Sequence, residues 1–375
     1  MSQINYKNFS TPSKLSLGYW LKLLDNIIGP LAVSICLCVK FFKNSNREII
    51  VKNPKRILVI RPGGMGDAIL LLPALNKFHQ CFPKAEIHIL AERRNASVFK
   101  GVLYIKKVYL YTRVLDLIMV LTTKYDLVID SEQWHRLSSV IAYLSRAPVR
   151  IGFATNERSK LFTIAVPYSH NKYEVHSFLD LFRPVIGEFN INLTKPFLKI
   201  IKNFPRLDDS YLWVGIFPGA SIVERRWPKE RFRAIAKWLS KKNIKIAIIG
   251  GEQEEYIADY ICRDISNCLN YCAKLTLLET ASLISQLKLL LTGDSGIMHL
   301  SISVGTPVVA LFGPGIQEKW APRDGISKII NKHLPCSPCT KFGYTSKCPH
   351  NAKCMREITL NEVKGAINDL LGQTY

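Results

Sequence analysis

Residues 292–299, Thr-Gly-Asp-Ser-Gly-Ile-Met-His, are of types that suit binding of a phosphate group. They follow an apolar run that predicts a strand, and they open a short predicted helix. Free backbone N–H groups at such a helix start can hold a diphosphate, so Asp294, Ser295 and Gly296 are candidate diphosphate-binding residues. His299 lies one turn further along. A single histidine usually has a structural role, but the spacing in this loop favours a place in the site.

A glycine-rich turn at residues 61–67, Arg-Pro-Gly-Gly-Met-Gly-Asp, lies between a predicted strand and a predicted helix. Gly63, Gly64 and Gly66 let the backbone turn tightly and approach a ligand. The spacing differs from the dinucleotide fingerprint, and no Lys-Ser/Thr follows as in a P-loop. Asp67 is the candidate catalytic residue because its carboxylate could take the proton of an attacking hydroxyl. The alternative is that Asp67 only caps the helix.

Two further strand-to-helix turns carry polar side chains that suit a nucleotide. In the first turn, Ser221 is small enough to approach phosphate oxygens, and Arg225 and Arg226 can neutralise a departing pyrophosphate. In the second turn, Glu254 could hold a ribose diol, as acids do in other nucleotide-binding folds. The alternative for Glu254 is a solvated acid in a turn.

The elements that must position these residues alternate between short β-branched runs and longer amphipathic stretches, which predicts parallel strands covered by helices. Expected strands lie at 56–60, 86–91, 125–130, 150–153, 211–220, 245–251, 289–294 and 307–313, and expected helices at 68–82, 139–146, 229–242, 254–265, 277–287 and 358–371. The series breaks near residue 205, so we expect two Rossmann-like α/β domains facing across a cleft, with ligands at the carboxyl ends of the strands.

Together these segments resemble glycosyltransferase family 9, the ADP-heptose:lipopolysaccharide heptosyltransferases. The matching segments are ILVIRPGGMGDAILLLPAL, YDLVIDSEQWHR with RIGF, FPGASIVERRWP and LLTGDSGIMHLSISVGTPVVALFGP, within about residues 55–315. The resemblance implies a GT-B fold and an inverting, metal-independent transfer of a heptose or related sugar, with ADP-heptose as donor and a lipopolysaccharide core or other lipid-linked glycan as acceptor.

The same resemblance implies roles for the candidate residues. Asp67 matches the family's proposed base, Ser221 and Arg225 match donor phosphate contacts, and Glu254 matches a ribose-binding acid. The loop from Asp294 to His299 matches the diphosphate loop. Loops at 156–160 and 170–177, on the acceptor side, match nothing that can be assigned. The alternative function is a GT-B protein of different specificity, such as an epimerase, or a non-catalytic binder of nucleotide-sugars.

The expected organisation is an extension at 1–50, an acceptor-side domain at 51–205, a nucleotide-sugar-binding domain at 206–335 and a tail at 336–375. The chain of 375 residues carries a net charge of +22, which favours anionic partners. Zinc-finger and RRM-type motifs are not found in the sequence, so nucleic acid is not an expected partner.

The N-terminal extension contains a 13-residue apolar run, Ile27–Val39, with lysines on both sides. A spanning helix needs about 20 residues. Either a helix on the anionic inner-leaflet surface of the bacterial inner membrane or a helix packed on the body would explain it. The membrane interpretation predicts a cytoplasmic, peripheral protein.

Four cysteines gather near the C-terminus as Cys336, Cys339, Cys348 and Cys354. They could form a structural zinc or redox cluster, or be plain cysteines. A catalytic zinc site is not expected, because the sequence suggests no open position beside a water-activating acid. The expectation is therefore that catalysis requires no cofactor.

Overall fold

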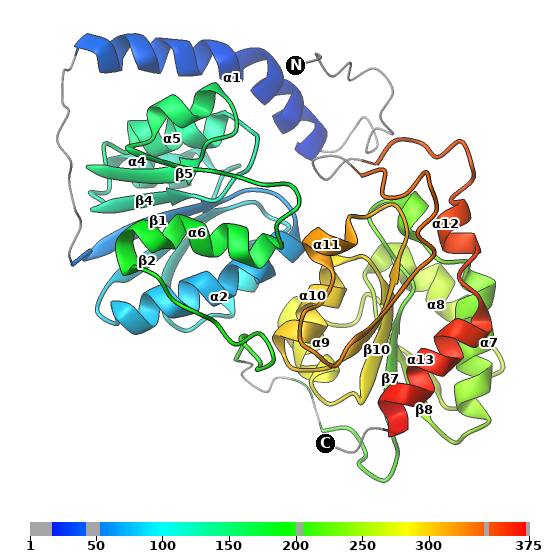
Figure 1. Cartoon of the computed structure of the whole chain (residues 1–375). Coiled ribbons are helices and arrows are strands. Elements are labelled where there is room, and N and C mark those ends of the chain that lie inside the picture. Colours follow the sequence, from blue (N-terminus) through cyan, green and yellow to red (C-terminus); the bar gives the residue numbers. More distant parts are fainter. Residues whose placement is uncertain (1–16, 43–52, 200–203, 205, 341–344, 373–375) are drawn as a thin grey trace. The chain divides into compact units, whose positions relative to one another are not determined.

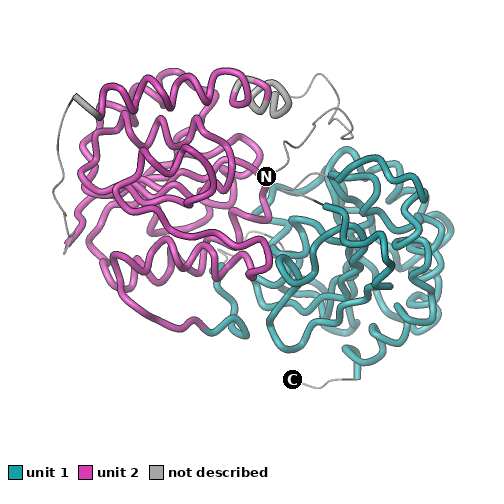
Figure 2. The backbone as a smooth tube through the Cα atoms, turned by 45° about the horizontal axis from the view of Figure 1, so that its top comes forward, with its two compact units in different colours: residues 1–10, 192–375 teal, residues 11–191 magenta. Residues whose placement is uncertain are grey.

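The computed structural model describes residues 17–42, 53–199, 204, 206–340 and 345–372, and these form two compact units (Figures 1 and 2). The N-terminal unit ends at Ile191 and the C-terminal unit begins at Asn192, whereas the sequence placed the boundary near residue 205. The earlier boundary has a local cause. The backbone amides of Phe197 and Leu198 both donate to the carbonyl of Ser303, at 3.0 and 2.9 Å, which ties this segment to the C-terminal unit.

The N-terminal unit is built on a six-stranded sheet in the order β3-β2-β1-β4-β5-β6, in which every neighbouring pair is parallel. Its strands are β1 (Arg56–Arg61), β2 (Glu86–Ala91), β3 (Ile105–Leu110), β4 (Leu127–Asp130), β5 (Val149–Phe153) and β6 (Ile164–Val166). Apolar side chains fill β1 on both faces, as expected of a central parallel strand covered by helices on both sides.

Helices cover both faces of this sheet. The set is α2 (Met65–Cys81), α3 (Ala96–Lys100), α4 (Val114–Thr122), α5 (Leu137–Leu144) and α6 (Glu174–Ile186), with a 3-10 turn η2 (Glu157–Leu161). Helices α2 and α6 pack together through the rings of Phe78 and Phe182, whose centroids lie 5.9 Å apart. On the other face, Val120 of α4 and Ala142 of α5 share a core cluster with Leu58 of β1.

Strand β3 was not expected from the sequence. Its residues Ile105–Leu110 read IKKVYL, and the two lysines are exposed. The strand lies at the edge of the sheet, where charged side chains are common because they discourage pairing with another chain. The same two lysines interrupt the apolar run by which a strand is recognised.

Helix α1 (Leu17–Phe42) lies along α5 in the N-terminal unit (Figure 1). Its inner side buries Val33 and Cys36 against Val140 and Leu161. The Asp25 carboxylate, which is 2% exposed, accepts the backbone N–H groups of residues 136 and 137 at the start of α5, at 2.7 Å each. The interpretation of α1 as a helix packed on the body is therefore correct for this side. Among the described helices, none is long and apolar enough to cross a membrane.

The C-terminal unit has a second six-stranded parallel sheet, in the order β12-β11-β10-β7-β8-β9. Its strands are β7 (Trp213–Phe217), β8 (Lys245–Ile248), β9 (Cys268–Asn270), β10 (Leu289–Gly293), β11 (Val308–Phe312) and β12 (Lys328–Asn331). Its helices are α7 (Lys229–Ser240), α8 (Glu255–Cys262), α9 (Leu277–Ile284), α10 (Gly296–Ser303), α11 (Gln317–Trp320), α12 (Lys353–Arg356) and α13 (Leu360–Gly372), with 3-10 turns η3 (Val223–Arg225) and η4 (Glu252–Glu254).

The tail belongs to the core of the C-terminal unit. Val363, Ile367 and Leu370 of α13 are fully buried in the same cluster as Ile235 of α7 and Leu291 of β10. The α/β class with two parallel sheets, predicted from the alternation of elements, is confirmed.

Candidate functional site

The glycine-rich turn joins β1 to α2 and presents Asp67 in the first turn of the helix. Gly63 has a φ of +102°, a conformation that favours glycine, and its N–H donates to Glu92 Oε1 at 3.0 Å. Gly64 is the N-cap residue of α2, so Asp67 is not the cap. The Asp67 side chain is 30% exposed, and its Oδ2 lies 4.0 Å from Arg61 Nη2. A carboxylate that reaches solvent at a helix N-terminus can accept a proton from a bound hydroxyl.

Arg61, beside Asp67, is held from several directions. Its side chain is 2% exposed, and its guanidinium donates to the carbonyls of Pro62 and Ser131, at 2.6 and 2.7 Å, and to Gln133 Oε1 at 3.3 Å. Glu132 Oε2 lies 3.4 Å from Arg61 Nη2. Because these partners fix the guanidinium, its positive charge stays beside the Asp67 carboxylate.

Glu132 is the anionic centre of this buried region, with its side chain 7% exposed. Its Oε1 accepts the backbone N–H groups of Trp134 and His135 at 3.0 and 3.3 Å. Burial opposes ionisation, but the electrostatic influence of His135, Arg61 and Arg158 outweighs it and lowers the pKa of Glu132 to about 2. Glu132 is therefore a structural anion that orients Arg61.

Two segments that the sequence left unassigned, 156–160 and 170–177, supply the rest of this region. Arg158 is fully buried, with Nη2 2.5 Å from Asp130 Oδ2. Glu174 is also fully buried and accepts from Gln133 Nε2 at 2.6 Å and from the hydroxyl of Tyr168. Sequence reasoning missed Arg158 and Glu174 because a single charged residue, in a short 3-10 turn or at the start of a helix, carries no pattern that signals burial.

In the C-terminal unit, the candidate donor residues follow three adjacent strands. Ser221 and Arg225 come after β7, Glu254 after β8 and Asp294 after β10, and the sheet order places β10, β7 and β8 side by side. Because the strands are parallel, their carboxyl ends lie at one edge of the sheet. The chain therefore brings these loops together in the way the sequence predicted.

Arg225 and Asp294 form a buried ion pair, with Nη1 2.8 Å from Oδ2 and side chains 13% and 5% exposed. Arg225 Nη2 also donates to Thr340 Oγ1 at 3.3 Å. Arg226, the second arginine of the turn, instead donates from Nε to the carbonyl of Ala220 at 2.9 Å and so braces its own loop. Only Arg225 is joined to the loop that follows β10.

The helix start expected after Asp294 is present. Ser295 is the N-cap of α10, its hydroxyl accepts the N–H of Met298 at 3.3 Å, and Gly296 is the first helical residue. His299 lies one turn further along and is 6% exposed. The exposed Ser221 remains accessible on the neighbouring loop.

Glu254 is buried, 9% exposed, so the interpretation of a solvated acid is wrong. Its Oε2 accepts the N–H of Gly251 at 2.9 Å. Its Oε1 lies against Gly219 so closely that a Cβ there would be 2.3 Å away. The acid is thus held between the loops after β7 and β8, where a nucleotide ribose binds in related folds.

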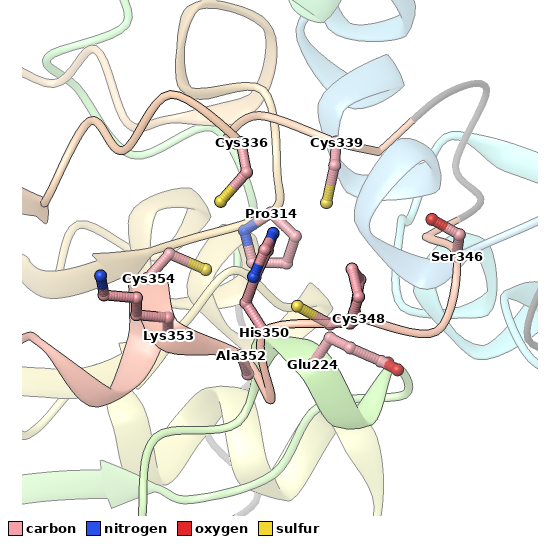
Figure 3. Close-up of a pocket in the computed structure, with 11 residues that line it drawn as sticks. Glu224, Pro314, Cys336, Cys339, Ser346, Cys348, His350, Ala352, Lys353 and Cys354 are labelled. Atoms are coloured by element: carbon pink, nitrogen blue, oxygen red, sulfur yellow. The ribbon is translucent and has the colours of Figure 1, made fainter.

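The four cysteines of the tail line one cavity of about 220 Å³, together with Glu224 and His350 (Figure 3). All four are free thiols. Burial is the main cause that raises the pKa of the Cys354 thiol to about 11 and also raises that of Cys339. Among the described residues, no three His, Cys, Asp or Glu side chains are already arranged to hold a metal ion. The zinc interpretation stays a prediction.

The family model and the curated relatives indicate one family. Residues 114–350 match the model of glycosyltransferase family 9 (heptosyltransferase). The lipooligosaccharide heptosyltransferase 2 of Campylobacter jejuni (serotype O:2) is 24% identical over 332 residues, which cover 85% of this chain and 99% of that relative.

Two solved structures share the fold. The glycosyl transferase family 9 protein of Veillonella parvula has a TM-score of 0.72 at 21% identity, covering 86% of this chain and 99% of its own. The Escherichia coli heptosyltransferase WaaC with ADP has a TM-score of 0.68 at 18% identity, covering 84% of this chain and 97% of its own. The two parallel α/β units are thus those of the GT-B architecture.

Proposed function

This chain belongs to glycosyltransferase family 9, and from that premise we propose that it transfers a heptose from ADP-heptose to a lipopolysaccharide core or other lipid-linked glycan, with inversion and without a catalytic metal. The observation that carries the proposal is the cluster at the carboxyl ends of β10, β7 and β8, where the Arg225–Asp294 pair, the start of α10 and the buried Glu254 gather. The helix start and the arginine suit a diphosphate, and the buried acid suits a ribose.

Asp67 is the proposed base. As the acceptor oxygen attacks the anomeric carbon from the side opposite the diphosphate, it loses its proton to the Asp67 carboxylate, and the bond to the leaving phosphate oxygen breaks. A single displacement of this kind inverts the anomeric carbon. Arg61, 4.0 Å away and held by its own hydrogen bonds, keeps the carboxylate oriented.

The departing diphosphate needs positive charge in place of a metal ion. The backbone N–H groups at the start of α10 point toward the loop after β10, and the helix dipole adds a partial positive charge there. Arg225 is the side-chain charge proposed to act on the leaving group, and Asp294 holds its guanidinium in place. Fixed groups of this kind stabilise developing negative charge without reorganisation.

The choice of ADP-heptose and of a lipopolysaccharide acceptor is supported by the names of similar proteins, the lipooligosaccharide heptosyltransferase of C. jejuni and the ADP complex of WaaC. The first test is calorimetric titration with ADP, GDP, UDP and dTDP. We expect selective ADP binding, and we expect Arg225→Ala to weaken it about tenfold or more, because a charge-assisted hydrogen bond is lost and Asp294 is left unpaired.

The exposed Arg206→Ala is the matched control and should leave ADP affinity unchanged. Selective binding of another nucleotide would discard heptose as the sugar and keep the transferase. Failure of all four to bind would contradict the donor site and favour a non-catalytic protein.

We also propose that α1 docks the enzyme on an anionic membrane surface from the cytoplasmic side. Its outer side exposes an apolar stripe at helical spacing, in which Ile27, Leu31, Ile35 and Val39 are 67, 63, 56 and 46% exposed. In the sequence, lysines lie on both sides of this apolar run, and Lys40, directly after the stripe, is exposed and donates from Nζ to the carbonyl of residue 160 at 2.7 Å. An apolar stripe with a basic margin suits the interface of an anionic bilayer.

The membrane proposal predicts the behaviour of a triple variant, Ile27→Ser/Leu31→Ser/Ile35→Ser. Because these side chains are exposed, the fold should survive, whereas co-sedimentation with vesicles containing anionic lipid should fall about tenfold or more. The control is Leu212→Ser/Leu269→Ser, two exposed residues of the C-terminal unit. Equal binding by the triple variant and the parent would rule out α1 as the docking element.

A further inference from the structure

The cysteine tail is built onto the loop that follows β11. The hydroxyl of Ser337 donates to the carbonyl of Gly313, and the N–H groups of Cys339 and Thr340 both donate to the carbonyl of Pro314, at 3.1 and 2.9 Å. A Cβ on Gly313 would lie 2.9 Å from Cys354 Sγ. The tail thus contacts this loop through both its first and its last cysteine-bearing segments.

The same loop contacts the proposed donor site on its other side. A Cβ on Gly315 would lie 2.1 Å from Asp294 Oδ2, so the loop packs directly on that carboxylate. Arg225, the partner of Asp294, donates to Thr340 of the tail at 3.3 Å. Thr340 is 3% exposed and its hydroxyl is also bonded to that of Thr345, at 2.7 Å. Arg225 is therefore bonded directly to the segment that carries the cysteines, and Asp294 packs on the loop to which that segment is attached.

Four thiols face one space in this segment. Cys336 and Cys339 come from one turn, Cys348 from the chain that returns beneath it, and Cys354 from α12, and their sulfur atoms point into the same cavity (Figure 3). Tetrahedral sites made of four thiolates select zinc or iron among the common metal ions. Four such groups within the 19 residues 336–354 exceed what packing of a small loop requires.

We propose that these four thiols close on one thiophilic metal ion, of the zinc or iron class, and that this ion clamps the tail against the loops of the donor site. Binding replaces four S–H protons by four metal–sulfur bonds of about 2.3 Å, and the protons pass to solvent. As the side chains stand, the sulfurs line the cavity wall, so the ion would draw them inward. The site is structural, because all four positions around the ion are taken by the chain.

The test uses the full-length protein purified without chelator. Metal analysis by mass spectrometry should find about one zinc or iron ion per chain, and Cys336→Ser/Cys348→Ser should lose it. Replacement by Co²⁺ should give the sulfur-to-cobalt charge-transfer absorption of a tetrahedral thiolate site in the parent and not in the variant. The control is Cys38→Ser/Cys81→Ser, which alters two exposed cysteines elsewhere.

A metal content that is the same in Cys336→Ser/Cys348→Ser and in the parent would overturn the site. A parent protein that holds no stoichiometric metal ion would also overturn the site, whether its four cysteines are found as free thiols or as disulfides. These readouts do not depend on activity. They therefore remain informative even if the proposed donor site fails.

The clamp itself rests on the proposed function and is tested by Thr340→Val. This change keeps the shape of the side chain and removes the hydroxyl that supports Arg225. We expect an unchanged metal content, a rise of about three- to tenfold in the KM for the donor, and a kcat within about twofold of the parent. Removal of the metal should raise the donor KM in the same way. An unchanged KM in both cases, with ADP still bound, would overturn the clamp while leaving the metal site standing.

Discussion

Asp67→Asn is expected to lower kcat about 10²- to 10⁴-fold, the range that a positioned general base contributes. Asparagine keeps the size of the side chain and its place in the first turn of α2, but its amide does not accept the proton of the attacking hydroxyl. The nucleotide is proposed to bind the other unit, so the dissociation constant for ADP should stay within about twofold. The measurement pairs steady-state transfer kinetics with calorimetric titration of ADP.

The control for this experiment is Asp209→Asn, which changes an exposed carboxylate of the C-terminal unit and should leave both constants unaltered. A kcat within about threefold of the parent in Asp67→Asn would remove Asp67 from the chemistry. A parallel loss of ADP affinity would assign Asp67 to donor binding, and the base would have to be sought elsewhere.

The position of Asp67 could be predicted because the glycine-rich turn has a local signature. Gly63 adopts a positive φ, the helix begins two residues later at Met65, and each feature depends on neighbours in the sequence. The loops after β7, β8 and β10 could be predicted for the same reason. Parallel strands bring their carboxyl ends to one edge, so the alternation of elements alone indicates which loops meet.

The pairing of side chains could not be predicted in this way. The sequence predicts a phosphate contact for Arg225 and Arg226 alike; in the structure Arg225 is paired with Asp294, and Arg226 bonds to its own loop. The backbone angles in η3 decide which of the two adjacent arginines reaches Asp294 in the loop after β10. The burial of Glu254 likewise depends on Gly219 of another loop, whose missing side chain leaves room for the carboxylate.

The buried charges behind Asp67 are the clearest case of information that only the fold supplies. Asp130 ends a strand and Arg158 lies in a 3-10 turn that matched nothing assignable in the sequence. Arg158 Nη2 lies 2.5 Å from Asp130 Oδ2, and both side chains are fully buried. Arg158 also donates to the carbonyl of Glu132, the residue that orients Arg61. The pair therefore supports the geometry of the proposed base as well as the sheet.

Arg158→Met is expected to destabilise the N-terminal unit by about 3–5 kcal/mol, because it leaves the Asp130 carboxylate buried without its partner. Hydrogen exchange of the backbone amides in β4 and β5 reads this unit separately from the other one, and its slowest amides should exchange about a hundredfold faster or more. The double variant Arg158→Met/Asp130→Leu removes both charges and should recover much of the loss.

The exposed pair of Arg206 and Asp209 provides the contrast, since Arg206→Met should change stability by less than about 1 kcal/mol. If the β4 and β5 amides of Arg158→Met exchanged at the parent rate, the buried pair would contribute nothing to the stability of this unit. The support that the pair gives to Glu132 would then be in doubt. If instead the double variant regained stability without regaining transfer activity, the charges would be needed for positioning Arg61 and Asp67. A buried pair that apolar residues can replace for folding would then be retained for the reaction.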